Sequence, residues 1–160
     1  MKNLSDTGTS NVPSGSGKRI AVIIAEWNSE ITFAMRDAAV STLQKHGCDD
    51  TNVVVHYVPG TFELTLGSLW AAMHADTDAV IAIGCVVRGE TPHFDYICKA
   101  VSYGITELNV NLRKPVIFAV LTTENLEQAK ERAGGKYGNK GEEAAITALK
   151  MLALRSSMMK

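Results

Sequence analysis

Residues 89–98 carry the side chains best suited to chemistry in this chain, because they place His93 at the expected start of a helix. The apolar run Ala79–Val87 comes just before and is typical of a buried strand. Thr91 suits the cap before a helix, and Pro92 suits the first helical position. A strand, a glycine-containing loop and a helix start together predict a cradle for a phosphate group. An imidazole beside that cradle can take and return protons near neutral pH.

Other candidates share this logic, and each also has a plain structural interpretation. His93 is compatible with an exposed helix residue that has no catalytic task. Trp27 follows an apolar strand and suits either core packing or stacking on a heteroaromatic ring. Glu63 can cap its helix or accept hydrogen bonds from a polyol. Arg132 can complement the end of a helix or bind phosphate through its guanidinium fork, and Asn28 is interpreted as a helix cap.

Composition limits the kind of protein that these residues serve. The chain has 160 residues, of which 46% are apolar, and this is enough for one core. A formal charge of −1 provides no broad field for nucleic acid or an anionic membrane, so we expect small phosphorylated ligands. Residues 1–17 are polar and predict a flexible N-terminal arm, followed by one domain over residues 18–160. No targeting pattern and no apolar run of about 20 residues occurs, so we expect a cytoplasmic protein.

The cysteines indicate neither a disulfide framework nor a metal site. Cys48, Cys85 and Cys98 are odd in number and lack the paired spacing of a structural zinc site. We interpret them as small apolar residues in a reducing compartment, and we expect no metal.

Short apolar runs alternate with longer amphipathic stretches, which predicts an α/β fold around a parallel sheet. Strands are expected at residues 19–25, 52–58, 79–87 and 115–121. Helices are expected at residues 28–47, 62–75, 92–112, 123–133 and 141–155, with a glycine-rich link at 134–141. Because parallel strands all end at one edge, the loops after them should bring distant polar and aromatic groups to a common rim.

Five segments of the chain, taken together and in order, resemble one known family. They are residues 27–28, 59–64, 84–95, 115–125 and 128–141, and they read WN, PGTFEL, GCVVRGETPHFD, PVIFAVLTTEN and QAKERAGGKYGNKG. The family that these segments resemble is lumazine synthase, and the likeness covers nearly everything after Lys18.

This resemblance implies a flavodoxin-like three-layer α/β/α sandwich with a four-stranded parallel sheet. It also implies pentamers with active sites between subunits, and the short link at residues 134–141 resembles that of members that form sixty-subunit icosahedral shells. The implied reaction joins 5-amino-6-(D-ribitylamino)uracil to 3,4-dihydroxy-2-butanone 4-phosphate in riboflavin biosynthesis, without a cofactor or metal.

The resemblance also implies roles for individual residues. His93 would transfer protons, and Phe118 and Arg132 would come from the adjoining subunit. The residues implied for the pyrimidine and the ribityl chain are Trp27, Thr61, Phe62, Glu63, Cys85, Val86, Val87 and Phe118. Those implied for the phosphate are Glu90, Thr91 and Arg132, with Lys140 as a weaker candidate.

Two alternatives remain at this point. Trp27 stands where phenylalanine is the more usual family residue, and this larger face is compatible with a flavin-binding or purely shell-forming protein that has lost turnover. A flavodoxin-type electron carrier is disfavoured, because no Ser/Thr-rich phosphate loop follows the first strand.

Overall fold

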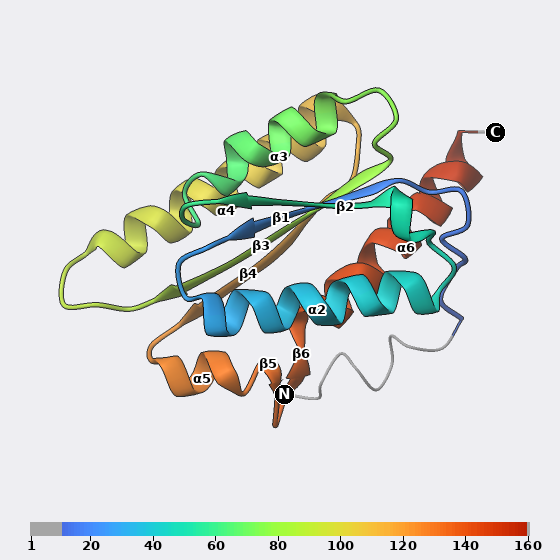
Figure 1. Ribbon diagram of the computed structural model, residues 1–160. Helices are drawn as coiled ribbons and strands as arrows, with labels where there is room; N and C mark the ends of the chain where they lie inside the picture. The colour runs from blue at the N-terminus through green and yellow to red at the C-terminus, as the bar shows by residue number, and fades with distance from the viewer. Residues whose placement is uncertain (1–10, 160) are drawn as a thin grey trace.

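The apolar runs of the sequence become the central sheet of a three-layer structure in the computed structural model, which describes residues 11–159 (Figure 1). The sheet has the order β2-β1-β3-β4, and every pairing in it is parallel. Its strands are β1 (Ile20–Ala25), β2 (Val53–Val58), β3 (Ala79–Val87) and β4 (Val116–Thr123). The flavodoxin-like α/β/α sandwich predicted from the sequence is confirmed.

Two pairs of helices cover the two faces of this sheet (Figure 1). One face carries α2 (Ser29–Lys45) and α6 (Lys140–Met158), and the other carries α3 (Leu64–Met73) and α4 (His93–Leu112). The remaining elements are η1 (Asp50–Asn52), α5 (Leu126–Lys130), β5 (Ala133–Gly135) and β6 (Gly138–Asn139).

Side chains of each strand alternate between two apolar cores. In β1, Ile20, Val22 and Ile24 pack with α2 and α6, whereas Ala21 and Ile23 pack with α3 and α4. This burial on both faces explains why the strands appear in the sequence as continuous apolar runs.

Several boundaries differ from those expected. β4 runs two residues beyond Leu121, because Thr122 and Thr123 pair with the end of β3. Helix α5 is shorter than predicted, and the residues after it fold back as the antiparallel hairpin β5-β6. Within the expected arm, Gly15 is buried and its N–H donates to the carbonyl oxygen of His46 at 2.8 Å, while residues 1–10 lie outside the described part.

The carboxyl ends of the strands meet at one edge of the sheet, as parallel pairing requires. Beyond β1 and β2 the pairing continues, with the N–H groups of Glu26 and Trp27 donating to the carbonyl oxygens of Val58 and Pro59. The loops after β1 and β2 are therefore held side by side. Across residues 11–159, no helix combines the length and apolar character that a bilayer crossing requires.

Candidate functional site

The first corner of the site is formed by the loops after β1 and β2. Trp27 is 66% exposed, and its ring lies so close to Gly60 that a Cβ there would be 2.5 Å from Cε3. The Gly60 N–H donates to Glu63 Oε2 at 3.1 Å, which fixes the carboxylate beside the same ring. An exposed aromatic face and an oriented carboxylate thus stand together, and Phe62 next to them is also exposed.

The end of β3 joins this corner through one backbone carbonyl. The oxygen of Cys85 accepts a hydrogen bond from Asn28 Nδ2 at 2.9 Å and one from Thr61 Oγ1 at 3.5 Å. Asn28 occupies the cap position before α2, as expected, but its side chain makes no cap bond, and the residue adopts a left-handed conformation with φ 59°. Its side chain instead ties the loop after β1 to β3, a role that no local pattern indicates.

Cys85 itself is buried, so its contribution to the rim comes from its backbone. Burial raises the pKa of its thiol to about 11, and the side chain therefore stays neutral. Val86 and Val87 are half-buried and follow it toward the rim.

The expected phosphate cradle lies between β3 and α4, and it is open to solvent. Residues 88–93 are exposed, and a Cβ added at Gly89 would meet no atom within 4 Å. Helix α4 begins at His93, with Pro92 in the cap position, so the cap predicted for Thr91 lies one residue later. Thr91 Oγ1 still accepts from the His93 N–H at 3.4 Å, and the first N–H groups of a helix have no partner within it.

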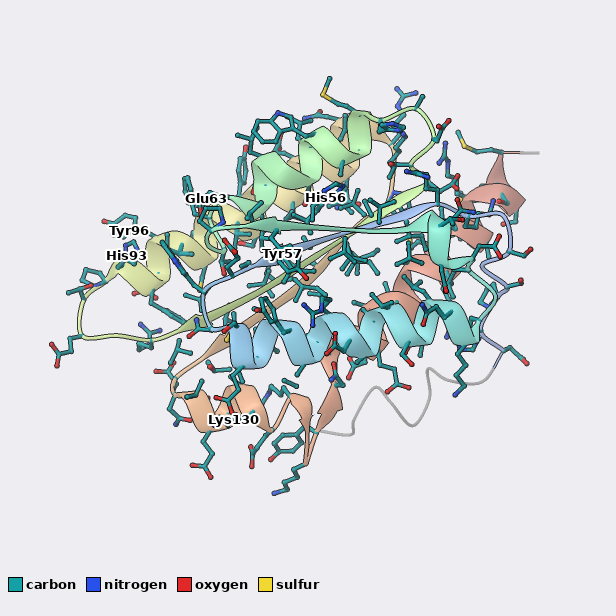
Figure 2. The ribbon with its side chains drawn as sticks, viewed as in Figure 1. His56, Tyr57, Glu63, His93, Tyr96 and Lys130 are labelled. Carbon is teal, nitrogen blue, oxygen red and sulfur yellow. The ribbon has the colours of Figure 1, made fainter. Side chains whose placement is uncertain are left out.

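His93 and Glu63 lie at the same end of the molecule, on the side of the sheet that carries α3 and α4 (Figure 2). Both side chains come from the residues that open these two helices. Glu90 and Thr91 precede His93 in the same loop. One chain therefore gathers an aromatic face, a carboxylate, a histidine and the open loop before α4 along one rim.

Phe118 does not belong to this rim within its own chain. It pairs with Ala82 in the middle of β4, three residues before Leu121, which is the partner of Cys85. At about 3.3 Å per residue, it lies roughly 10 Å behind Leu121, and β4 continues to Thr123. It is 42% exposed on an edge strand, so its ring faces outward.

Arg132 also lies apart from His93, because it follows α5, which packs into the core on the α2 and α6 side. Its Nη1 donates to the carbonyl oxygen of Gln128 at 2.9 Å, and its guanidinium carbon lies 4.8 Å from the centroid of the Tyr137 ring. Lys140, the weaker candidate, pairs with Glu143 at 2.6 Å.

Sequence reasoning missed one further cluster at the rim, which centres on Arg88. Its Nε donates to Glu124 Oε2 at 2.8 Å, and its Nη1 lies 3.3 Å from Asp95 Oδ1. The bond to Glu124 raises the pKa of the guanidinium above its ordinary value, so the group remains a cation. The pairing depends on how the ends of β3 and β4 align, which no single segment reveals.

No group of three or more His, Cys, Asp or Glu side chains that could hold a metal ion occurs among residues 11–159. The three free cysteines are spread over separate elements.

Comparisons with known proteins agree with this geometry. The family model of 6,7-dimethyl-8-ribityllumazine synthase matches residues 17–156. A curated protein of that name from Porphyromonas gingivalis is 59% identical, over 95% of this chain and 94% of its own length. Another from Cytophaga hutchinsonii is 58% identical over 95% of each chain, and one from Phocaeicola vulgatus is 49% identical over 99% of this chain and 94% of its own. The chain belongs to the 6,7-dimethyl-8-ribityllumazine synthase family.

Proposed function

We propose that this chain condenses 5-amino-6-(D-ribitylamino)uracil with 3,4-dihydroxy-2-butanone 4-phosphate. The products are 6,7-dimethyl-8-ribityllumazine, inorganic phosphate and water, and the reaction serves riboflavin biosynthesis. The observation that carries the proposal is the family match over residues 17–156 of a chain whose Trp27, Glu63 and His93 share one rim.

The corner around Gly60 suits the pyrimidine substrate. Trp27 offers an exposed flat face for the heterocycle, and such aromatic contacts contribute about 1 kcal/mol beyond area burial. Glu63 uses one oxygen for the Gly60 N–H and keeps further lone pairs for the hydroxyls of a ribityl chain. Thr61 and Phe62 flank that chain, and the backbone of residues 85–87 meets the pyrimidine edge.

The loop before α4 suits the phosphate of the second substrate. We assign Glu90 and Thr91 to it through their backbone N–H groups, since the start of a 20-residue helix favours negative charge. His93 follows directly and can transfer protons during imine formation and during the proton shift that expels phosphate. Orientation of the two reactants supplies much of the remaining rate enhancement.

A second copy of the chain completes the site in this proposal. Phe118 would close the aromatic slot of a neighbour, and Arg132 would clamp the neighbour's phosphate, because neither lies at the rim of its own chain. Large apolar side chains on α3 and α4 support such an assembly: Leu66, Trp70, Met73, Tyr96, Tyr103 and Val110 are all exposed.

A pocket of about 400 Å³ between α3 and the edge strand β2 is a further surface that a neighbouring subunit can fill. The assembly that we propose is a pentamer, with a sixty-subunit shell as the larger form, and we place it in the cytoplasm, where three free cysteines remain reduced.

The test incubates the protein with both substrates and follows lumazine fluorescence and phosphate release. We expect turnover by the wild type and a rate roughly 10²-fold lower for His93→Ala, with activity retained because orientation persists. His46→Ala removes a histidine at the C-terminal end of α2, outside the pocket between α3 and β2 and away from the rim, and serves as the matched control.

No lumazine from the wild type would refute the proposed activity, and an unchanged rate in His93→Ala would remove that residue from its role. A protein that is yellow on purification yet inactive would instead fit the flavin-binding alternative suggested by Trp27. Light scattering on the same sample distinguishes a pentamer from a shell.

A further inference from the structure

Arg88 is the first residue after β3, and it contacts the end of β4 and the first turn of α4 on either side of the loop of residues 89–92. Its N–H donates to the carbonyl oxygen of Thr123 at 2.9 Å, which extends the β3-β4 ladder by one step. Its Nε reaches Glu124 just beyond β4, and its two terminal nitrogens face Asp95 in the first turn of α4 at 3.3 to 3.4 Å.

The guanidinium of Arg88 also stacks on an aromatic ring. Its central carbon lies 4.1 Å from the centroid of the Phe94 ring, and that ring is buried under α4. A planar fork with five donors can serve two carboxylates and one ring at once, whereas an ammonium group cannot reproduce this geometry. Both ends of the phosphate loop are thereby tied to one side chain.

The loop between those ends has few constraints of its own. Residues 89–92 are exposed, and there is open space around Gly89. The direction in which its N–H groups point therefore depends on how the exit of β3 and the start of α4 are held. Arg88 fixes both of them, and it links them to the exit of β4.

Charge gives Arg88 a second task. Asp95, Glu124 and Glu90 place three carboxylates around a loop to which the proposed function brings a phosphate dianion. The negative carboxylates repel the negative phosphate and so oppose its binding. A single cation, Arg88, between Asp95 and Glu124 reduces that repulsion. Exposed ion pairs contribute little to folding, and the Arg88 side chain is 38% exposed, so fold stability does not account for this arrangement.

We propose that Arg88 is a positioning residue for the phosphorylated substrate, holding the loop of residues 89–92 and screening Asp95 and Glu124 from the phosphate. This inference rests on the proposed function of the same rim. It adds a residue that binds through its neighbours rather than through direct contact with substrate.

The test measures KM for each substrate separately. In Arg88→Met we expect KM for the butanone phosphate to rise about tenfold, with KM for the ribitylaminouracil changed less than about twofold. Arg88→Lys keeps the positive charge but loses the planar guanidinium. Its KM for the butanone phosphate should lie between the values of the wild type and Arg88→Met. Adding Asp95→Asn and Glu124→Gln to Arg88→Met should recover part of the lost affinity, because the repulsion is then gone while the loop is still not held by Arg88.

Arg36→Met is the matched control, since Arg36 also pairs with a carboxylate, Asp37, and stacks on a phenylalanine, Phe33, at 4.5 Å. It lies on α2, away from the phosphate loop, and should leave both KM values unchanged. An equal rise in both KM values for Arg88→Met, or a rise in Arg36→Met of the same size, would overturn the proposal.

The triple variant decides between screening and direct contact. If it binds the phosphorylated substrate as weakly as Arg88→Met does, screening is refuted. Calorimetric binding of inorganic phosphate to wild type and Arg88→Met provides a readout that does not need turnover. Absence of lumazine synthesis by the wild type would therefore count against the proposed function, while equal phosphate binding by both proteins would count against Arg88.

Discussion

Gly60→Ala should damage the pyrimidine side of the site while leaving the fold in place. The added Cβ would lie 2.5 Å from Cε3 and 2.6 Å from Cζ3 of Trp27, and 3.1 Å from Oε2 of Glu63. Ordinary contacts begin near 3.4 Å, so the indole must move by about 1 Å. The φ angle of residue 60 is not in the left-handed region, so the effect of the substitution is steric.

Two interactions with the substrate are affected by that displacement. The stacking face loses its position, at a cost of about 1 kcal/mol, and the carboxylate loses its backbone anchor, at a cost of about 1 kcal/mol more. A combined loss of about 2 kcal/mol corresponds to a rise of about thirtyfold in KM for the ribitylaminouracil. KM for the butanone phosphate should change less than about twofold, because its loop follows β3.

The assay is steady-state lumazine formation with each substrate varied in turn. Urea unfolding is measured in parallel, and we expect little change, because the obstructing atoms belong to an exposed side chain that can rotate. Gly89→Ala is the control for KM of the ribitylaminouracil, because a Cβ there meets nothing within 4 Å and its loop is assigned to the other substrate. Adding Trp27→Phe to Gly60→Ala should restore part of the affinity, since the smaller ring vacates the contested space.

Three results would refute this reasoning. The first is an unchanged KM for the ribitylaminouracil in Gly60→Ala. The second is an equal rise for both substrates, which would indicate a general distortion of the rim. The third is a double variant no better than Gly60→Ala, because the clash with the indole would then not be the cause.

Two further predictions concern stability. In Gly141→Ala the Cβ would overlap the backbone carbonyl of Met35 where α6 crosses α2, and no side-chain rotation relieves the overlap. The free energy of unfolding in urea should therefore fall by about 3 kcal/mol. An unfolding midpoint equal to that of the wild type would contradict this. Burial raises the pKa of Cys85 from 9.0 to about 11, so the folded state holds a proton that the unfolded state releases, and stability should fall as pH rises from 9 to 11. Cys85→Ala should flatten that part of the unfolding profile, and an identical slope in both proteins would refute the assignment.

The strands were predictable because a strand that is buried on both faces appears in the sequence as a continuous apolar run. β3 occupies the predicted residues, and β1 and β2 start one residue later than expected. The last two residues of β4 were missed because Thr122 and Thr123 are polar, and only their pairing with Val86 and Val87 makes them strand. Residues 131–139 were read as the end of a helix and a link, but their hydrogen bonds form a hairpin instead.

The positions of individual residues along the rim were easier to predict from the sequence than the contacts between them. A strand followed by a loop and a helix start places His93 at a rim without knowledge of its neighbours. The bond from Asn28 to Cys85 spans 57 positions, and the pair of Arg88 with Glu124 spans 36, so both depend on the register of neighbouring strands. Apolar spacing likewise failed to show that Leu66, Trp70 and Met73 of α3 face outward in a single chain.

In the proposed function the loop of residues 89–92 binds a phosphate, and its charges indicate that one chain alone does not complete that site. Arg88 is the cation closest in sequence to that loop in the described chain, and Glu124 and Asp95 already occupy its donors. A phosphate bound there needs a further cation, and Arg132 presents a guanidinium held by Gln128 and Tyr137 on a different face of the molecule. The simplest way to bring that cation to the loop is a second copy of the chain. Dilution that separates the copies should then weaken binding of the phosphorylated substrate before it unfolds the subunit.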